Sequence, residues 1–315
     1  MQIGTTLLPY IALWYLMYLS LSVSYWITLA LSIPAAGFLI RSFIIAHDCG
    51  HGSFFKSRKA NEIVGVLTDL LLFTPYHHWR QDHAKHHATA GNLDHRGAGD
   101  IWTLTIREYL ALPLWKRVQY RAYRNPWLMF TVGAFYAIII GQRWARPSTS
   151  KRELQSVHRT NFMVLVVVVG MSMIMGLKAY LLIQIPIFFL SSAIGVWLFY
   201  VQHQFEGVYW EREEEWDYVT VALEGSSFYD LPPVLHWFTG NIGYHHIHHL
   251  SPRIPNYNLA RCHRENDIYQ KVKQVTLVSS LKSLSYRLWD EERRLLVGFK
   301  AVKSWREREG IAPQG

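Results

Sequence analysis

The sequence LLPYIALWYLMYLSLSVSYW occupies residues 7–26 and contains no charged side chain. A helix needs about 20 apolar residues to cross the hydrocarbon core of a bilayer, and this stretch has that length. Residues 27–46 form a second apolar run, interrupted by Arg41 near its end, where a long side chain can snorkel to the interface. The link between the two runs is short and uncharged, which predicts a helical hairpin.

A second hairpin is predicted further along the chain. Its helices are TNFMVLVVVVGMSMIMGL at residues 160–177 and LLIQIPIFFLSSAIGVWLFYV at residues 181–201, with the turn at Lys178-Ala179-Tyr180. Two shorter apolar runs, 63–76 and 126–141, fall below spanning length. We predict that 63–76, which ends near Pro75, lies at the membrane interface.

The run 126–141 has basic residues on both sides. The positive-inside rule therefore places both of its ends in the cytoplasm and predicts a re-entrant or interfacial segment. The flanking residues are Lys116, Arg117, Arg121, Arg124, Arg143, Arg146, Lys151 and Arg152.

Composition supports a membrane protein with a water-facing part. Of 315 residues, 50% are hydrophobic, 15% aromatic and 17% charged, and the charges are dense in residues 203–315. The formal charge of +9 suits an anionic membrane surface, and no stripe of Lys and Arg indicates nucleic acid as a partner. The two cysteines form no CxxC pair, which argues against a thiolate zinc site and a disulfide framework.

These patterns predict a single all-α integral-membrane domain over residues 1–315, with four transmembrane helices. The first apolar run lacks the features of a cleaved signal peptide and is expected to remain as a span. A helical cap on the cytoplasmic side is predicted from residues 47–125, 142–159 and 202–315. Within it, residues 280–309 mix apolar and basic positions at helical spacing, as in a helix on the membrane surface or a packed, solvated helix.

Histidine is the unusual residue type, with 16 in the chain, and it is clustered. Three boxes stand out: HDCGH at 47–51, HAKHH at 83–87 and HHIHH at 245–249. An isolated His203 follows the last predicted span. Residues at i, i+3 and i+4 share a face of a helix, so the imidazoles of each box can point the same way. The candidate metal ligands are His47, His51, His83, His86, His87, His203, His245, His248 and His249.

Nine candidates are too many for one ion and suit two. Neutral imidazole binds iron, zinc and copper among others, so the ligand set by itself does not name the metal. Ligands that share a metal must lie on one side of the membrane. That condition holds if 63–76 makes no crossing and the hairpin at 160–201 makes two, in agreement with the charge argument.

Other polar residues are candidates for holding ligand rings through the far imidazole nitrogen. They are Asp48, Asp82, Asp94, Asp230 and Asn241. The remaining histidines, among them His77, His78 and His246, are expected at the surface or beside the ligands.

The three boxes, in this order, resemble the membrane fatty acid desaturase family. GNLDHRGAGDIWTLTIREY after the second box, FYVQHQFEGVYWEREEEWDYV around His203, and EGSSFYDLPPVLHWFTGNIGYHHIHHLSPRIPNYNL around the third box are similar to bacterial acyl-lipid desaturases. The resemblance covers residues 40–265. It is greatest to bacterial Δ5 and cyanobacterial-type Δ12 enzymes that act on lipid-bound chains.

The resemblance implies four spanning helices under a cytoplasmic cap in the cell membrane, with two iron ions held by the nine histidines. It implies an O2-dependent enzyme that puts a cis double bond into a membrane-lipid acyl chain, with electrons from a separate protein such as ferredoxin or flavodoxin. One position departs from the pattern: animal acyl-CoA desaturases have Asn one turn before the isolated ligand, and this chain has Phe199. Asn241 or a nearby polar group is then expected to substitute, or the second iron is held differently.

Desaturation removes hydrogen from unactivated CH2 groups, which no side-chain base can do, so the oxidant must come from the metal and O2. A fatty acid or carotenoid hydroxylase or ketolase on the same scaffold is the nearest alternative. A metal transporter is a remote one, because its ligands would lie within the spans near the bilayer midplane.

Overall fold

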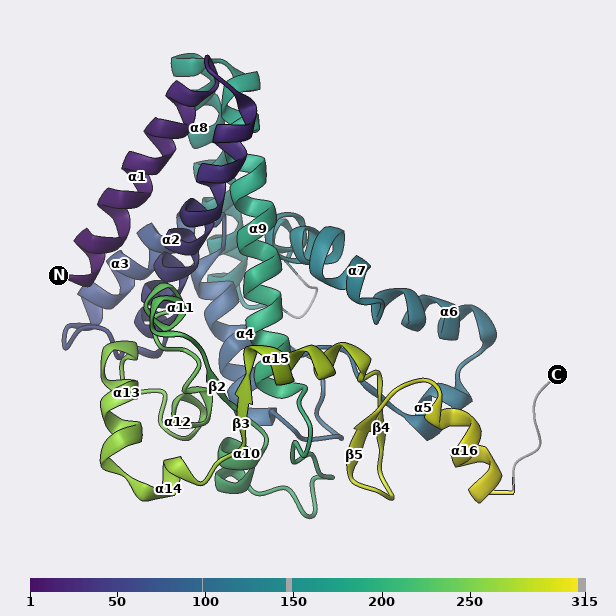
Figure 1. The fold of residues 1–315 in the computed structure, drawn as a ribbon. Coiled ribbons are helices and arrows are strands. Elements are labelled where there is room, and N and C mark those ends of the chain that lie inside the picture. Colours follow the sequence, from purple (N-terminus) through teal and green to yellow (C-terminus); the bar gives the residue numbers. More distant parts are fainter. Residues whose placement is uncertain (98, 146–148, 311–315) are drawn as a thin grey trace.

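The computed structural model describes residues 1–97, 99–145 and 149–310, and Arg146 lies outside these ranges. Within them, four helices are long and apolar enough to cross a membrane: α1 (Gln2–Ser20), α2 (Tyr25–His51), α8 (Lys151–Met175) and α9 (Leu177–His203). They form the upper part of the molecule, and most of the remaining chain lies below them as a cap (Figure 1).

The turns of both hairpins differ from the predicted positions by a few residues. The first turn lies at residues 21–24, so Tyr25 and Trp26 begin α2. The second lies at Gly176, whose φ of +85° ends α8, so Lys178 belongs to α9. An apolar run conceals such breaks, because the residues on either side of the turn are equally uncharged.

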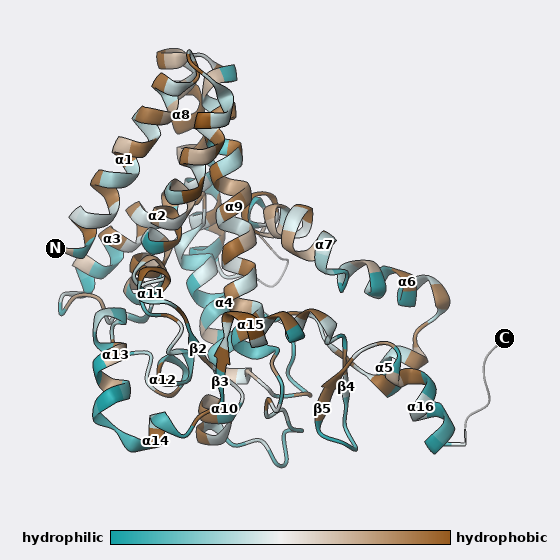
Figure 2. Ribbon diagram, viewed as in Figure 1, coloured by the Kyte–Doolittle hydropathy of each residue, from teal (hydrophilic) through white to brown (hydrophobic). Residues whose placement is uncertain are grey.

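The four long helices are buried to different extents. In the most apolar window of α2, 56% of the residues are buried, whereas in that of α8 the share is 6%. A helix with so much apolar surface outside the protein needs lipid around it, since water would leave a large hydrophobic patch exposed. Hydrophobic colouring accordingly follows the long helices, and hydrophilic colouring gathers in the cap (Figure 2). The chain is a membrane protein with α2 near the centre of its helix bundle.

Neither short apolar run is among the four candidate spans. The first is divided between α3 (Arg58–Leu70), which Ser57 caps through the Ala60 N–H, and α4 (Tyr76–Thr89), which follows Pro75. The second forms α7 (Pro126–Leu128), two π-helical segments (Met129–Gly133 and Tyr136–Ile140) and a 3-10 turn (Gly141–Arg143).

The cap is built from short elements. Its helices are α5 (Ile106–Ala111), α6 (Leu114–Tyr123), α10 (Tyr218–Glu224), α11 (Pro233–Phe238), α12 (His245–Leu250), α13 (Asn256–Glu265), α14 (Asp267–Gln270), α15 (Leu277–Ser280) with a 3-10 turn (Leu281–Ser285), and α16 (Ala301–Arg308). In one small sheet β1 (Leu104–Thr105) runs parallel to β4 (Leu288–Asp290), which pairs antiparallel with β5 (Leu295–Val297). In the other, β2 (Phe228–Asp230) runs parallel to β3 (Gln274–Thr276).

Two expectations about this region are wrong. Residues 280–309 are not a continuous helix, because β4 and β5 form a hairpin there and helix is restored at α16. Trp289 of this hairpin is buried and belongs to a hydrophobic core with Tyr200 of α9. Arg41 does not snorkel to the interface: it is 8% exposed, and its guanidinium lies 4.0 Å from the ring centroid of Trp237 in α11.

Candidate metal centre

The first histidine box forms the end of α2. His47 and His51 lie one turn apart, with ring centroids 4.8 Å apart. Gly52 ends the helix at φ +70°, a left-handed conformation that glycine adopts without strain. The pair therefore projects from the cap end of a spanning helix.

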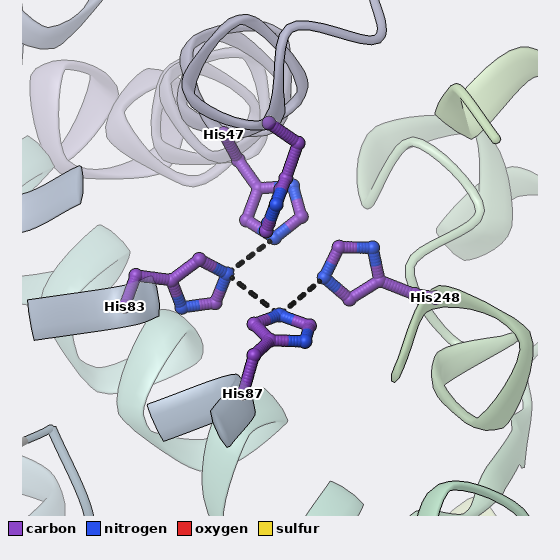
Figure 3. A group of neighbouring side chains, drawn as sticks. His47, His83, His87 and His248 are labelled. Carbon is purple, nitrogen blue, oxygen red and sulfur yellow. Dashed lines mark hydrogen bonds between the residues drawn. The ribbon is translucent and has the colours of Figure 1, made fainter. Parts of the chain in front are cut away.

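The second and third boxes lie on α4 and α12 and face this pair. His83 Nε2 lies 3.0 Å from His47 Nε2 and 3.1 Å from His87 Nε2. His248 Nε2, from α12, lies 2.9 Å from His87 Nε2. Figure 3 shows the rings of His47, His83, His87 and His248 turned toward a common centre.

The nine candidate ligands separate into two groups. In each, the ligand atoms lie within 4.8 Å of one another. The five-histidine group is His47, His51, His83, His87 and His248, and the four-histidine group is His86, His203, His245 and His249. His203 joins the second group from the last turn of α9, with its Nε2 3.1 Å from His86 Nε2 and 2.9 Å from His245 Nε2. Residues that are far apart in the chain thus make two adjoining clusters of imidazole.

The hydrogen bonds of these rings suit cations. The Nδ1 of His86 lies 2.5 Å from Asp100 Oδ1, and the Nδ1 of His203 lies 3.3 Å from the Gly225 carbonyl oxygen. Since both partners are acceptors, each Nδ1 carries the proton and each Nε2 presents a lone pair. Two lone pairs 3.1 Å apart repel each other unless a cation lies between the rings. The donor set therefore fits a metal ion.

The same logic holds in the five-histidine group. His47 Nδ1 lies 3.2 Å from Asp48 Oδ1, which leaves the Nε2 of this ring as an acceptor. Asp48 is fixed in turn, because its Oδ2 accepts hydrogen bonds from the backbone N–H of Asn256 at 2.6 Å and from its side chain at 2.8 Å. Asp48 is thus the one predicted ring-holding residue that contacts a box histidine.

Burial and neighbouring imidazoles favour the neutral, metal-binding form of the rings. Desolvation, followed by repulsion from nearby histidines, lowers the pKa well below 6.5 for the ligand candidates outside the spanning helices. These are His83, His87, His245, His248 and His249.

Four of the predicted ring-holding residues contact other partners. Asp94 pairs with Arg212, Asp230 accepts from Gln274 at 2.7 Å, and Asn241 donates to the Asn256 carbonyl at 3.2 Å. Asp82 lies 3.9 Å from His78, whose other nitrogen lies 3.4 Å from Glu153 in α8. His78, Asp82 and Glu153 form a third cluster with metal-binding residue types, which links α4 to α8.

Sequence reasoning missed Asp100, the carboxylate that holds His86. The available signal was a glycine: Gly99 has a φ of +81°, and a Cβ there would meet the Cβ of His86 at 3.4 Å. Close approach of this loop to α4 requires a residue without a side chain. His246, in contrast, is fully buried outside both groups and lies beside His263 and Tyr269.

Phe199 occupies one side of the four-histidine group. Its ring centroid lies 4.9 Å from that of His86 and 5.2 Å from that of His203. A cavity of about 30 Å³ adjoins it, lined by His86, Asp100, Phe199, His203, Gln204 and Trp210 among others. Roughly 10–15 Å³ is enough for one water molecule, so this cavity suits a very small molecule and is too small for an acyl chain.

Comparisons with known proteins agree with this geometry. The family model described as "Fatty acid desaturase" matches residues 6–275. A Bacillus subtilis protein named "Fatty acid desaturase" is 49% identical over 302 residues, covering 96% of this chain and 86% of that protein. A Synechocystis protein named "sn-1 oleoyl-lipid 12-desaturase" is 27% identical over 234 residues, 71% of this chain and 64% of its own length. Another, named "sn-1 acyl-lipid omega-3 desaturase (ferredoxin)", is 26% identical over 239 residues, 70% of this chain and 61% of its own length.

Proposed function

The chain belongs to the fatty acid desaturase family, and from this premise we propose that it introduces a cis double bond into the acyl chain of a membrane lipid. As a member of that family it is an oxidoreductase. The proposed reaction converts –CH2–CH2– into –CH=CH–, with O2, two electrons and two protons consumed and two waters released. The convergence of nine imidazoles in two groups at the cap end of the spanning helices supports it most directly.

We propose that the two groups hold a pair of non-haem iron ions. Four and five neutral imidazoles are suitable donor sets for divalent iron, and the paired lone pairs of His86 and His203 require a cation. When bound, an iron pair supplies the oxidation by O2 that no side chain can perform. Asp100, Asp48 and the Gly225 carbonyl keep the rings oriented with Nε2 toward the ions.

The protein contributes a dry and precisely arranged environment. Seven of the nine ligand candidates are buried, and so are the α9 residues that lead to His203. The small cavity beside Phe199 has room for O2. The larger groove of the molecule, about 940 Å³, is lined by residues 25–33 of α2 and 177–190 of α9, at the opposite end of these helices from the histidines. That groove is therefore not where we place the reacting carbons.

The proposed substrate is a lipid-bound chain, desaturated at position 5 or position 12. Two relatives carry names that specify lipid-bound chains. Burial of each CH2 contributes about 0.8 kcal/mol regardless of its position along the chain. Regioselectivity must therefore come from the shape of the path to the metal centre.

We place the metal centre on the cytoplasmic side of the cell membrane, where a separate protein such as ferredoxin or flavodoxin supplies electrons. The basic residues around 126–141 favour this orientation by the positive-inside rule. One Synechocystis relative has ferredoxin in its name.

The test is expression in a bacterial host that lacks membrane desaturases, followed by mass spectrometry of its lipids with localisation of double bonds. We expect new monounsaturated chains with one dominant double-bond position, and none with the His86→Ala variant. Hydroxylated or ketone products without new double bonds would contradict the proposal.

A further inference from the structure

The metal centre approaches the protein surface at one edge. Of the nine ligand candidates, His51 and His83 are partly exposed, and the other seven are buried. Their rings lie side by side in the five-histidine group, with centroids 4.9 Å apart. An electron that arrives there reaches a ligand ring without crossing further protein.

Exposed basic side chains lie around this edge. Arg80 packs against the end of α2, since a Cβ on Gly50 would lie 3.8 Å from its Cγ. Lys56 is exposed in the loop that follows Gly52. We call the surface formed by His51, Gly52, Lys56, Arg80 and Arg253 the His51 edge.

Arg253 belongs to this edge because two hydrogen bonds hold its loop against the end of α2. Just after it, the Asn256 backbone N–H donates to Asp48 Oδ2 at 2.6 Å, and the Tyr257 hydroxyl donates to the Phe54 carbonyl at 3.2 Å. The same loop follows α12, which contributes His248 to the five-histidine group.

The acidic residues of the adjoining elements have partners of their own. Asp48 is buried against His47 and Asn256. Glu62 of α3 pairs with Arg152 at 3.2 Å. Asp82 of α4 lies 3.6 Å from Lys85. These acids do not neutralise Lys56, Arg80 and Arg253, and the His51 edge presents positive charge to a partner.

We propose that the His51 edge is the docking surface of an acidic protein electron carrier. This rests on the proposed function, which requires two electrons per double bond from outside the chain. Complementary charge raises the association rate and orients the carrier so that its redox group approaches His51 and His83. An anionic lipid headgroup would also be attracted, but the exposed ligand rings give this edge a role in electron entry that lipid binding does not explain.

The test measures binding of a plant-type [2Fe–2S] ferredoxin to the iron-loaded protein in uncharged detergent. The variant is Arg80→Gln combined with Arg253→Gln. Arg293→Gln, an exposed arginine between β4 and β5 on the far side of the cap, is the matched control (Figure 1). At low ionic strength we expect the double variant to weaken binding by about tenfold and the control to leave it unchanged. The difference should disappear in high salt, where the Debye length is roughly 3 Å at 1 M.

Two further measurements separate this proposal from the proposed function. Reduction of the iron by dithionite with methyl viologen, which needs no docking surface, should occur at the wild-type rate in the double variant. Product formation by the wild type tests the desaturase proposal independently. Wild-type ferredoxin affinity in the double variant, or an equal loss in Arg293→Gln, would overturn the docking proposal. So would weaker binding of the double variant to phosphatidylglycerol vesicles with ferredoxin binding unchanged, which would reassign the edge to the membrane.

Discussion

The two histidine groups differ in what surrounds them. The five-histidine group includes the partly exposed His51 and His83. The four-histidine group is fully buried, has one ligand candidate fewer, and adjoins Phe199 and a closed cavity of about 30 Å³. One group therefore faces the surface, while the other faces enclosed space in which a small molecule is shielded from water. The contrast indicates that the two metal positions are not interchangeable.

Removing a ligand from either group should have the largest effect. His86→Ala takes a ring from the four-histidine group, and His248→Ala takes one from the five-histidine group. Each should lower product formation by more than about 100-fold and reduce bound iron below two ions per chain, because a ligand matters at least as much as its hydrogen-bonded support. Lipid analysis and elemental analysis measure both effects. A His86→Ala protein with full iron and full activity would contradict the assignment.

A smaller effect is expected from Asp100→Ala, which removes the carboxylate that holds His86. The loss should be about 10–100-fold in metal affinity or activity, and the four-histidine position should lose its ion first. Iron retention during dialysis against a chelator measures this. Asp94→Ala is the control, because Asp94 pairs with Arg212 and contacts no box histidine. Equal iron loss from both variants would remove the distinction between the two carboxylates.

A buried carboxyl outside both groups provides a comparison for stability. Asp69 of α3 is fully buried, and within the described residues its carboxyl oxygens have no hydrogen-bond partner. Burial raises its pKa well above 3.8, so the folded protein keeps a proton that the unfolded chain releases. Stability attributable to this group is therefore lost as pH rises above about 3.8.

The isosteric variant Asp69→Leu should remove this loss. Its melting temperature should exceed that of the wild type by about 2–4 °C at pH 8, with a smaller gain at pH 5. Thermal unfolding of the metal-free protein in detergent at the two pH values measures it. A gain that is larger at pH 5 would show that the sign of the pKa shift is wrong.

The smallest effect is expected at His246, a histidine of the third box that belongs to neither group. His246→Phe should keep two irons per chain and remain within about twofold of wild-type product formation, because an aromatic ring can pack in the same place beside His263. Iron loss as large as that of His248→Ala would show that this ring supports the metal centre.

The sequence allowed the ligand candidates to be identified but not their division between two groups. His83, His86 and His87 lie on one face of α4, yet His86 joins a different group from its neighbours. At about 100° per residue, positions i and i+4 lie closer in direction than either does to i+3, so a helix placed between two sites can serve both. Which ring serves which site depends on the partners from α9 and α12, and periodicity does not show that.

The loops and the short strands were harder to predict than the helices. Asp100 reaches His86 from a loop without periodic spacing, and only the backbone at Gly99 indicates the close approach. The β4–β5 hairpin was mistaken for helix because its apolar residues pack on Tyr200, a contact distant in sequence. In contrast, long uncharged runs and helical spacing are local properties, and they predicted the spanning helices and the boxes.

Anomalous X-ray scattering at the iron edge, from crystals of the iron-loaded protein, tests the central claim most directly. We expect two peaks, one surrounded by His47, His51, His83, His87 and His248 and the other by His86, His203, His245 and His249. A single peak, or peaks away from these imidazoles, would contradict the account.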